Sequence, residues 1–234
     1  MKIKSILVFC LLGLSFLCAS FSVDAQSSIK CPVCGKDNKL NMTLSGKGTD
    51  TRLDMKPMGF DENPPWQIPV CPECGFVVYT DSLTDSELAI VKNFIKSSDY
   101  VKYREREPNC LLAQLFIKLK KEKLDIAFAF LKASWQTEDK PLFYKEDLTA
   151  CIKYLDEYLK QAGDVSPAAL QYLVLKGELL RLSGSFDEAQ KTFHQAYILL
   201  SNLNNKNGFD RVLDFEFELL QKKDSAPHAF SEIP

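Results

Sequence analysis

The chain has 234 residues, of which 46% are hydrophobic and 26% are charged, and its formal net charge at pH 7 is −2. This composition is ordinary for a soluble globular protein and excludes a chain that is disordered throughout. The nearly balanced charge also excludes the strongly basic surface that nucleic acid or anionic lipid attracts. The length suits one large domain or two small ones.

Residues 1–25 have the pattern of a signal peptide. Lys2 and Lys4 precede an almost unbroken apolar run over 6–18, and small residues follow at positions that a signal peptidase reads. We expect cleavage after Ala25 and a periplasmic or secreted product. Because the run is shorter than the roughly 20 apolar residues of a membrane span, membrane contact is expected only through the signal peptide or an uncleaved or lipidated N-terminus.

Residues 26–81 lack helical periodicity and are interrupted repeatedly by glycine and proline. Short β-prone pieces at 40–44 and 76–80 predict short strands. A unit of about 55 residues with so little contiguous apolar sequence seldom folds by burial alone. Domains of this size usually depend on a metal or on disulfides.

Two copies of a C-P-x-C-G motif, at 31–35 and 71–75, carry the chemistry of this segment. Two residues between the cysteines let both sulfurs face one point from one tight turn, in which proline presets φ and glycine accepts a positive φ. Backbone amides of such a turn can also donate hydrogen bonds to the sulfurs. Two of these knuckles supply the four thiolates of a closed structural zinc site. We therefore predict a zinc ribbon over 26–81 that holds one structural Zn²⁺ on Cys31, Cys34, Cys71 and Cys74.

Other fates of these cysteines stay open. An exported protein meets an oxidising compartment, so disulfides within or between the pairs are one alternative, and iron bound by the same thiolates is another. A C-P-x-C pair also resembles the redox pair of thioredoxin-like oxidoreductases, which would make the chain a periplasmic thiol-disulfide oxidoreductase. Such a pair should open a helix, whereas Gly35 and Gly75 follow at once and no amphipathic helix continues from either motif.

Residues 82–223 read as helical hairpins. The segment 84–87 has the capping-box pattern, and apolar residues then recur at helical spacing in about seven stretches joined by short links. The chain is thus predicted to be mainly α, with a small zinc ribbon followed by a stack of hairpins, and 224–234 is predicted to be a flexible tail. Cys110 and Cys151 fall in or beside the helical stripes, either as buried apolar residues or as a disulfide between helices.

The segment 170–203 resembles one tetratricopeptide repeat. The residues that carry the resemblance are Leu173, Gly177, Gly184, Phe186, Ala189, Phe193 and Ala196, although Leu173 replaces the usual aromatic residue and Ser201 the usual proline. In that family the first helix of a repeat lines a concave peptide groove. The resemblance therefore implies partner binding at Gln171, Val174, Glu178 and Arg181, with an ordinary solvated helix face as the alternative.

A wider resemblance covers roughly residues 31–200. The paired C-P-x-C-G knuckles, Asn63-Pro64 before the second knuckle, and the segment 131–135 in the helices are similar to an uncharacterised bacterial family, a domain of unknown function with a tetratricopeptide-like tail. The resemblance implies a zinc ribbon that leads into helices, and no established activity. An exported start departs from that family.

Catalytic motifs are absent from the sequence. His194 and His228 accompany no nucleophile motif, and there is no Gly-rich phosphate loop, H-E-x-x-H or G-x-S-x-G. A four-thiolate zinc ion leaves no open position for a substrate, and the basic residues between the knuckles are offset by acidic ones, which argues against nucleic-acid binding. We expect a non-enzymatic, zinc-binding module of the cell envelope that binds a protein or peptide partner.

Overall fold

The structure is a computed structural model that describes residues 26–41, 48–59, 67–162, 167–203 and 206–234. The predicted signal peptide and Asn63-Pro64 lie outside the described residues. The described elements are β1 (Gln26–Lys30), β2 (Asp37–Asn41), β3 (Asp50–Thr51), β4 (Pro57–Met58), α1 (Asp85–Phe94), α2 (Ser98–Val101), α3 (Pro108–Lys118), α4 (Lys123–Gln136), α5 (Pro141–Ala162), α6 (Pro167–Leu182), α7 (Phe186–Ser201), α8 (Phe209–Gln221) and the 3₁₀ helix η1 (Phe230–Glu232).

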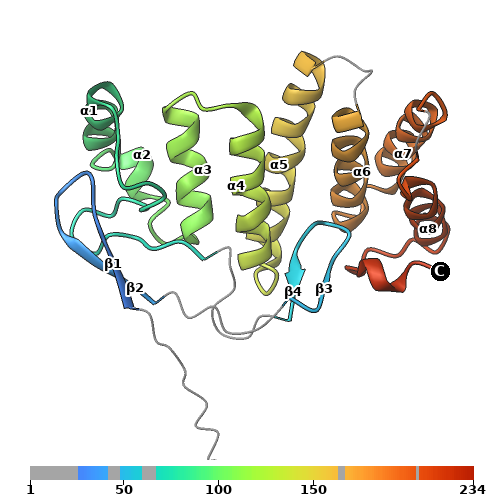
Figure 1. Cartoon of the computed structure of the whole chain (residues 1–234), viewed down its shortest axis with the longest axis horizontal. Helices are drawn as coiled ribbons and strands as arrows, with labels where there is room; N and C mark the ends of the chain where they lie inside the picture. Colours follow the sequence, from blue (N-terminus) through green and yellow to red (C-terminus); the bar gives the residue numbers. More distant parts are fainter. Residues whose placement is uncertain (1–25, 42–47, 60–66, 163–166, 204–205) are drawn as a thin grey trace, which may run out of the picture.

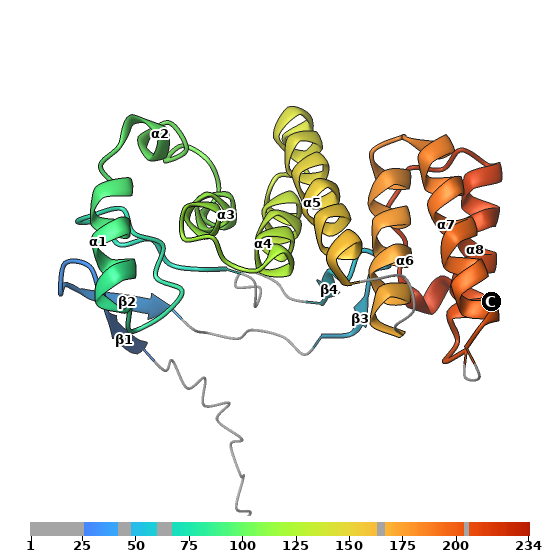
Figure 2. The same ribbon diagram turned by 90° about the horizontal axis from the view of Figure 1, so that it is seen from above.

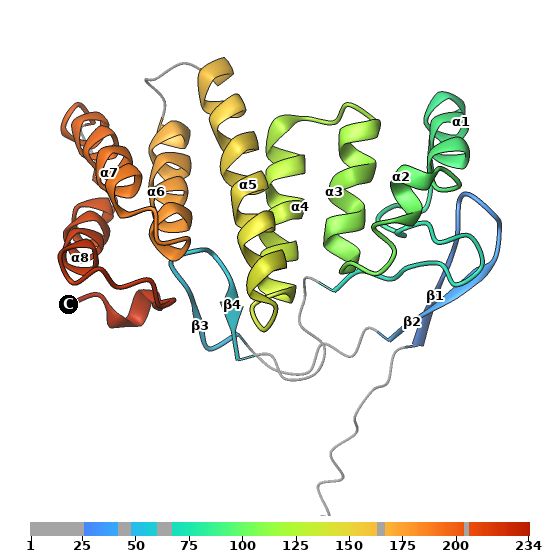
Figure 3. The ribbon, with the colours of Figure 1, turned by 180° about the vertical axis from the view of Figure 1, so that it is seen from behind.

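The helices stand side by side in chain order, as Figure 1 and the views from above and behind in Figures 2 and 3 show. Consecutive long helices from α3 to α8 contact each other, so the stack is built from neighbours in sequence. The predicted fold class, mainly α with a small N-terminal β element, is confirmed. One helix more than expected is present among the described residues, because the short α2 forms a single turn. Within the described chain, every helix is too short or too polar to span a bilayer.

Local signals set where several helices begin. The capping box of α1 is present, with the Glu87 amide 3.3 Å from Thr84 Oγ1 and the Thr84 amide donating to Glu87 at 3.0 Å. Pro108, Pro141 and Pro167 each stand at the first position of a helix, where the missing amide hydrogen is no loss. The start of α1 is therefore where the capping-box pattern at 84–87 predicts it.

The strand predictions were less accurate. Antiparallel β1 and β2 pair Lys30 with Asp37, so the strand expected at 40–44 begins earlier, and residues 42–44 lie outside the described part. The strand expected at 76–80 is absent, since only Val77 pairs, in an isolated bridge with Val70. These residues instead bury their side chains: Phe76 and Val77 belong to the hydrophobic cluster that also contains helices α1 to α5.

The α6–α7 hairpin depends on a glycine. A Cβ at Gly177 would lie 2.3 Å from Cε1 of Phe193, a ring that is fully buried. We expect Gly177→Ala to destabilise the protein by about 1–3 kcal/mol through overpacking, measured by urea denaturation. Adding Phe193→Leu, which makes room for the methyl group, should restore part of the loss; a double variant less stable than both single variants would contradict this explanation.

The segment between the two knuckles reaches the other end of the stack. Figures 1 and 3 show β1 and β2 beside α1, while the β3–β4 hairpin lies below α5 and α6 beside η1. The Leu53 amide donates to the His228 carbonyl at 2.9 Å, and Arg52 pairs with Ala229. Arg52 also bonds Glu138 at the end of α4, so the hairpin ties three distant parts of the chain together.

The C-terminal segment was predicted to be a flexible tail, and this prediction was wrong. Residues 224–234 are folded: they contain η1 and run beside β3. Arg181 Nη1 donates to the carbonyl oxygens of Asp224 at 2.8 Å and Ala226 at 2.9 Å. The segment is held because its backbone carbonyls satisfy a buried guanidinium, a partner that its own sequence does not reveal.

Candidate metal centre

The two C-P-x-C-G motifs adopt the same turn. The Gly35 amide donates to the Cys31 carbonyl at 2.8 Å, and the Gly75 amide donates to the Cys71 carbonyl at the same distance. Gly35 and Gly75 have φ values of 75° and 76°, which residues with side chains rarely adopt. The local geometry predicted from the motif is therefore present twice.

The four cysteine sulfurs converge. All of them lie within 4.8 Å of one another, with Cys31 Sγ 3.7 Å from Cys74 Sγ and Cys34 Sγ 3.6 Å from Cys71 Sγ. Tetrahedral coordination with metal–sulfur bonds of about 2.3 Å places ligand sulfurs about 3.8 Å apart, whereas a disulfide needs about 2.05 Å. The spacing therefore fits a closed thiolate site for one metal ion.

Backbone amides stabilise negative charge on these sulfurs unevenly. Burial tends to raise the pKa of Cys71, but amide hydrogen bonds from Cys74 and Glu73 outweigh it and lower that pKa to about 7. Burial raises the pKa of Cys31 and of Cys74, although amides also donate to both. Four thiolates this close repel one another. A divalent cation among them would remove that repulsion, so the donor set fits a metal.

The second knuckle is supported by the short helix α2 and the residues after it. Tyr100 is fully buried, and its hydroxyl donates to the Gly75 carbonyl at 2.9 Å. Arg104 donates to the Cys74 carbonyl at 3.3 Å. Cys31 and Cys71 are buried while Cys34 is exposed, so the cluster has one face against the helices and one face toward solvent.

A family model described as "Uncharacterized protein conserved in bacteria (DUF2225)" matches residues 25–214. The chain belongs to the DUF2225 family. The match includes both knuckles and the helices through the first part of α8. No curated protein and no solved structure matches the chain.

The four residues predicted to bind a partner lie in two different environments in this DUF2225 protein. Gln171 is exposed and Val174 is 7% exposed, and both line a cavity beside α6. Glu178 and Arg181 are 1% and 0% exposed, so they form neither a groove nor a solvated face, and their assignment to partner binding was wrong. Both are covered because α8 and the C-terminal segment pack over this part of α6.

Glu178 and Arg181 belong instead to a buried ion cluster with Glu216. Arg181 Nε lies 2.8 Å from Glu178 Oε2 and 3.0 Å from Glu216 Oε2. A second charged group lies under the hairpin, where Asp54 accepts hydrogen bonds from Arg52 at 3.0 Å and from Trp135 Nε1 at 3.1 Å. Sequence reasoning missed both groups, since Glu216 and Trp135 lie far along the chain from the residues that they contact.

The other cysteines and the histidines of the described residues have structural contacts. Cys110 and Cys151 are buried in the helical core and unbonded, which confirms the interpretation as buried apolar residues. His194 is exposed on α7, with its ring 5.0 Å from the ring of Phe217. His228 bonds two carboxylates of the C-terminal segment and so helps to hold that segment in place.

Proposed function

We propose that this DUF2225 protein is a non-catalytic protein-interaction module of the cell envelope, stabilised by one structural zinc ion. The ligands are Cys31, Cys34, Cys71 and Cys74. The observation that carries the proposal is the convergence of these four sulfurs at the spacing of a thiolate tetrahedron. Such a set favours zinc among the divalent metals and leaves no position for a substrate.

The surroundings of the knuckles favour a structural role. Cys31, Cys71 and Phe76 share one hydrophobic cluster with the first five helices, so the metal would set the shape of a surface that the helices pack against. A redox-active C-P-x-C pair should stand at a helix N-terminus, where the thiolate is stabilised. The first pair leads into strand β2 and the second into irregular chain, and the first described helix begins only at Asp85. That supports the structural role over the oxidoreductase alternative.

The helical stack supports the interaction role. Arrays of helical hairpins expose long continuous surfaces that commonly bind other proteins. Of the described histidines, His194 lies against an aromatic ring and His228 bonds two carboxylates, which supports structural roles for both. Export rests on the N-terminal sequence pattern alone.

Native mass spectrometry of the protein recovered from the cell envelope tests the proposal. We expect a chain that begins at Gln26 and carries one zinc ion, with all its cysteines reactive toward a thiol reagent after denaturation. A metal-free species lighter by two or four hydrogens would contradict the metal site and favour a disulfide-linked module. Reduction of a model disulfide by the purified protein would favour the oxidoreductase.

The interaction role is tested by capture from envelope extract. Wild-type protein is compared with Cys31→Ser, which should lose the metal. We expect the wild type to capture a defined partner in stoichiometric amount and the variant to capture less of it. Equal and nonspecific capture by both proteins would count against an interaction module that depends on the metal.

A further inference from the structure

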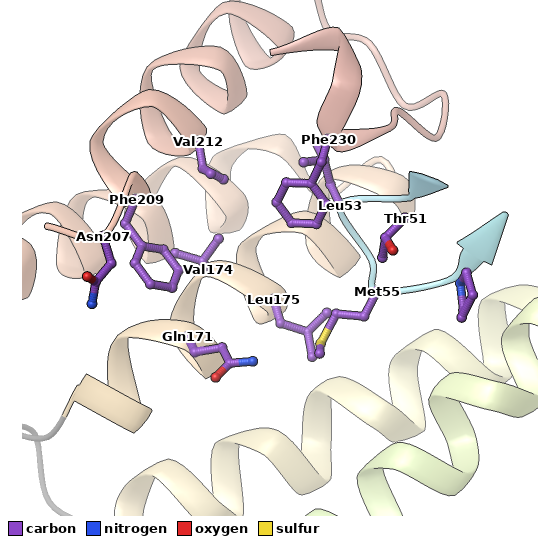
Figure 4. A pocket seen from close by; sticks show the side chains of 11 residues that line it. Thr51, Leu53, Met55, Gln171, Val174, Leu175, Asn207, Phe209, Val212 and Phe230 are labelled. Carbon is purple, nitrogen blue, oxygen red and sulfur yellow. The ribbon is translucent and has the colours of Figure 1, made fainter. Parts of the chain in front are cut away.

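A cavity of about 370 Å³ lies where three distant parts of the chain meet. Its walls come from the β3–β4 hairpin, from α6, and from the start of α8 together with η1. Figure 4 shows Phe209 and Phe230 on opposite sides of the space, with Leu175 between α6 and the hairpin and Gln171 near its edge. The cavity exists only while the hairpin is docked on α6.

The lining of the cavity is uncharged. The polar groups among its lining residues are the Thr51 hydroxyl and the amides of Gln171 and Asn207, and the other lining residues are aliphatic, proline, methionine or aromatic. A charged ligand would lose its hydration here without gaining a counter-charge, which is strongly unfavourable. The occupant is therefore uncharged and mainly apolar.

The volume of the cavity and its open rim restrict further which occupants fit. A cavity of about 150 Å³ can take up benzene, so this volume accommodates a large aliphatic or an aromatic side chain. The floor is buried, since Leu53, Val174 and Leu175 are 4%, 7% and 3% exposed, whereas Phe230 at the rim is 41% exposed. Free small-molecule ligands are usually enclosed over about 70–90% of their surface. An open rim suits a side chain whose parent chain continues outside.

We propose that this cavity binds one uncharged apolar side chain of a peptide segment from a partner protein. This inference rests on the proposed interaction role and names the chemistry of the partner. A buried apolar anchor surrounded by a polar rim is the usual source of affinity in such contacts. Gln171 is exposed at the edge of the cavity, so its amide can pair with the peptide group next to the anchor.

Methyl NMR with a blocked amino acid tests the site directly. N-acetyl-L-tryptophanamide carries an uncharged anchor side chain and two peptide groups. Titration of the full chain should shift the methyl signals of Met55, Val174 and Val212 in a saturable way. The signals of Leu142 and Ile198, which are exposed elsewhere on the helices at 70% and 64%, should not move. N-acetyl-L-lysinamide should leave the cavity signals unchanged.

Three variants define the contacts. Val212→Phe fills the cavity from α8 and Phe230→Ala removes part of its rim, and each should weaken N-acetyl-L-tryptophanamide binding about tenfold. Tyr197→Ala is the matched control, because this aromatic residue is similarly exposed, at 50%, and lies outside the cavity. Gln171→Ala should weaken binding of the blocked amino acid several-fold without changing the affinity for 3-methylindole, which has no peptide group.

Each contrary result removes the inference. Shifts at Leu142 and Ile198 as large as those at Met55 would mean nonspecific apolar contact. Equal affinity for 3-methylindole and for both enantiomers of the blocked amide, unaffected by Gln171→Ala, would mean a small-molecule pocket. Capture of the same envelope partner by Val212→Phe and by the wild type would overturn the peptide site while leaving the proposed interaction role intact. Absence of any captured partner would instead remove the interaction role.

Discussion

Replacing Cys31 by serine is expected to abolish stoichiometric zinc binding and to lower the midpoint of thermal unfolding by on the order of 10 °C or more. The reason is that structural zinc contributes an apparent free energy of about 10–16 kcal/mol at neutral pH, as large as the total stability of a typical domain, about 5–15 kcal/mol. Cys31 is buried in the cluster shared with α1 to α5, so its loss affects more than the knuckle. Zinc content by elemental analysis and unfolding by circular dichroism measure the two effects.

Cys110→Ala is the matched control for this experiment. Cys110 is also a buried cysteine thiol, but it lies outside the cluster of four sulfurs. This variant should keep one zinc ion and lose only the stability of a smaller buried side chain. Full zinc occupancy in Cys31→Ser, or loss of zinc in Cys110→Ala, would show that the ligands are assigned wrongly.

Loss of the metal should also destabilise the docked β3–β4 hairpin, at the other end of the helical stack. A bound metal would join Cys34 to Cys71 and close the chain segment that contains the β3–β4 hairpin. In the chain-entropy treatment of cross-links, closing a loop of this size is worth about 4 kcal/mol. In Cys31→Ser, hydrogen exchange at the Leu53 amide, which donates to His228, is therefore expected to accelerate. The exchange rate of the Phe193 amide, inside α7, should differ much less between the variant and the wild type.

The turns that hold the cluster of four cysteines were predictable because the information for each turn is local. Each C-P-x-C-G motif contains the proline, the glycine and the spacing that its own turn requires, and the repeat of the motif indicates that the two turns meet. The start of α1 was predictable for the same reason, since Thr84 and Glu87 are three residues apart. Within each knuckle turn and within the capping box, the groups that interact belong to one short segment.

The packing of α8 and the C-terminal segment over α6 was not predictable because its contacts join residues that are remote in sequence. Glu178 and Arg181 were read as surface positions since charged side chains are rarely buried. Their burial depends on Glu216 in α8 and on backbone carbonyls after it, which a single sequence does not pair with them. The hairpin is a similar case: nothing near Leu53 indicates that its amide meets His228.

Replacing Arg181 by methionine is expected to destabilise the protein by about 3–5 kcal/mol. Glu178 and Glu216 are 1% and 0% exposed, and both depend on this guanidinium. Removing one partner of a buried ion cluster leaves an uncompensated charge, which is the costly change. The carbonyls of Asp224 and Ala226 lose their donor as well. Arg211→Met, an exposed arginine in α8, is the matched control and should change stability by less than about 0.5 kcal/mol. Urea denaturation measures both.

The same cluster should make stability depend on pH in a defined direction. Burial raises the pKa of Glu216 to about 7, against the attraction of Arg181, and burial together with the charge of Glu216 raises the pKa of Glu178. An unfolded glutamate titrates near 4.5, so between about pH 4.5 and 7 the folded state binds more protons than the unfolded state. This contribution to stability is therefore present below pH 4.5 and is lost as the pH rises through 7, by at most about 1.4 kcal/mol per pH unit for each proton.

Glu216→Gln isolates this contribution, because it keeps the shape of the side chain and removes its charge. The charged groups that face the pair are Arg181 on α6, His228 in the C-terminal segment and Asp54 in the hairpin, and they stay in place in the variant. The free energy of unfolding of the wild type minus that of Glu216→Gln should fall as the pH rises from 5 to 8. A difference that rises over this range would mean that Glu216 is ionised and stabilised by Arg181 in the folded protein. The folded state would then bind no extra proton at Glu216.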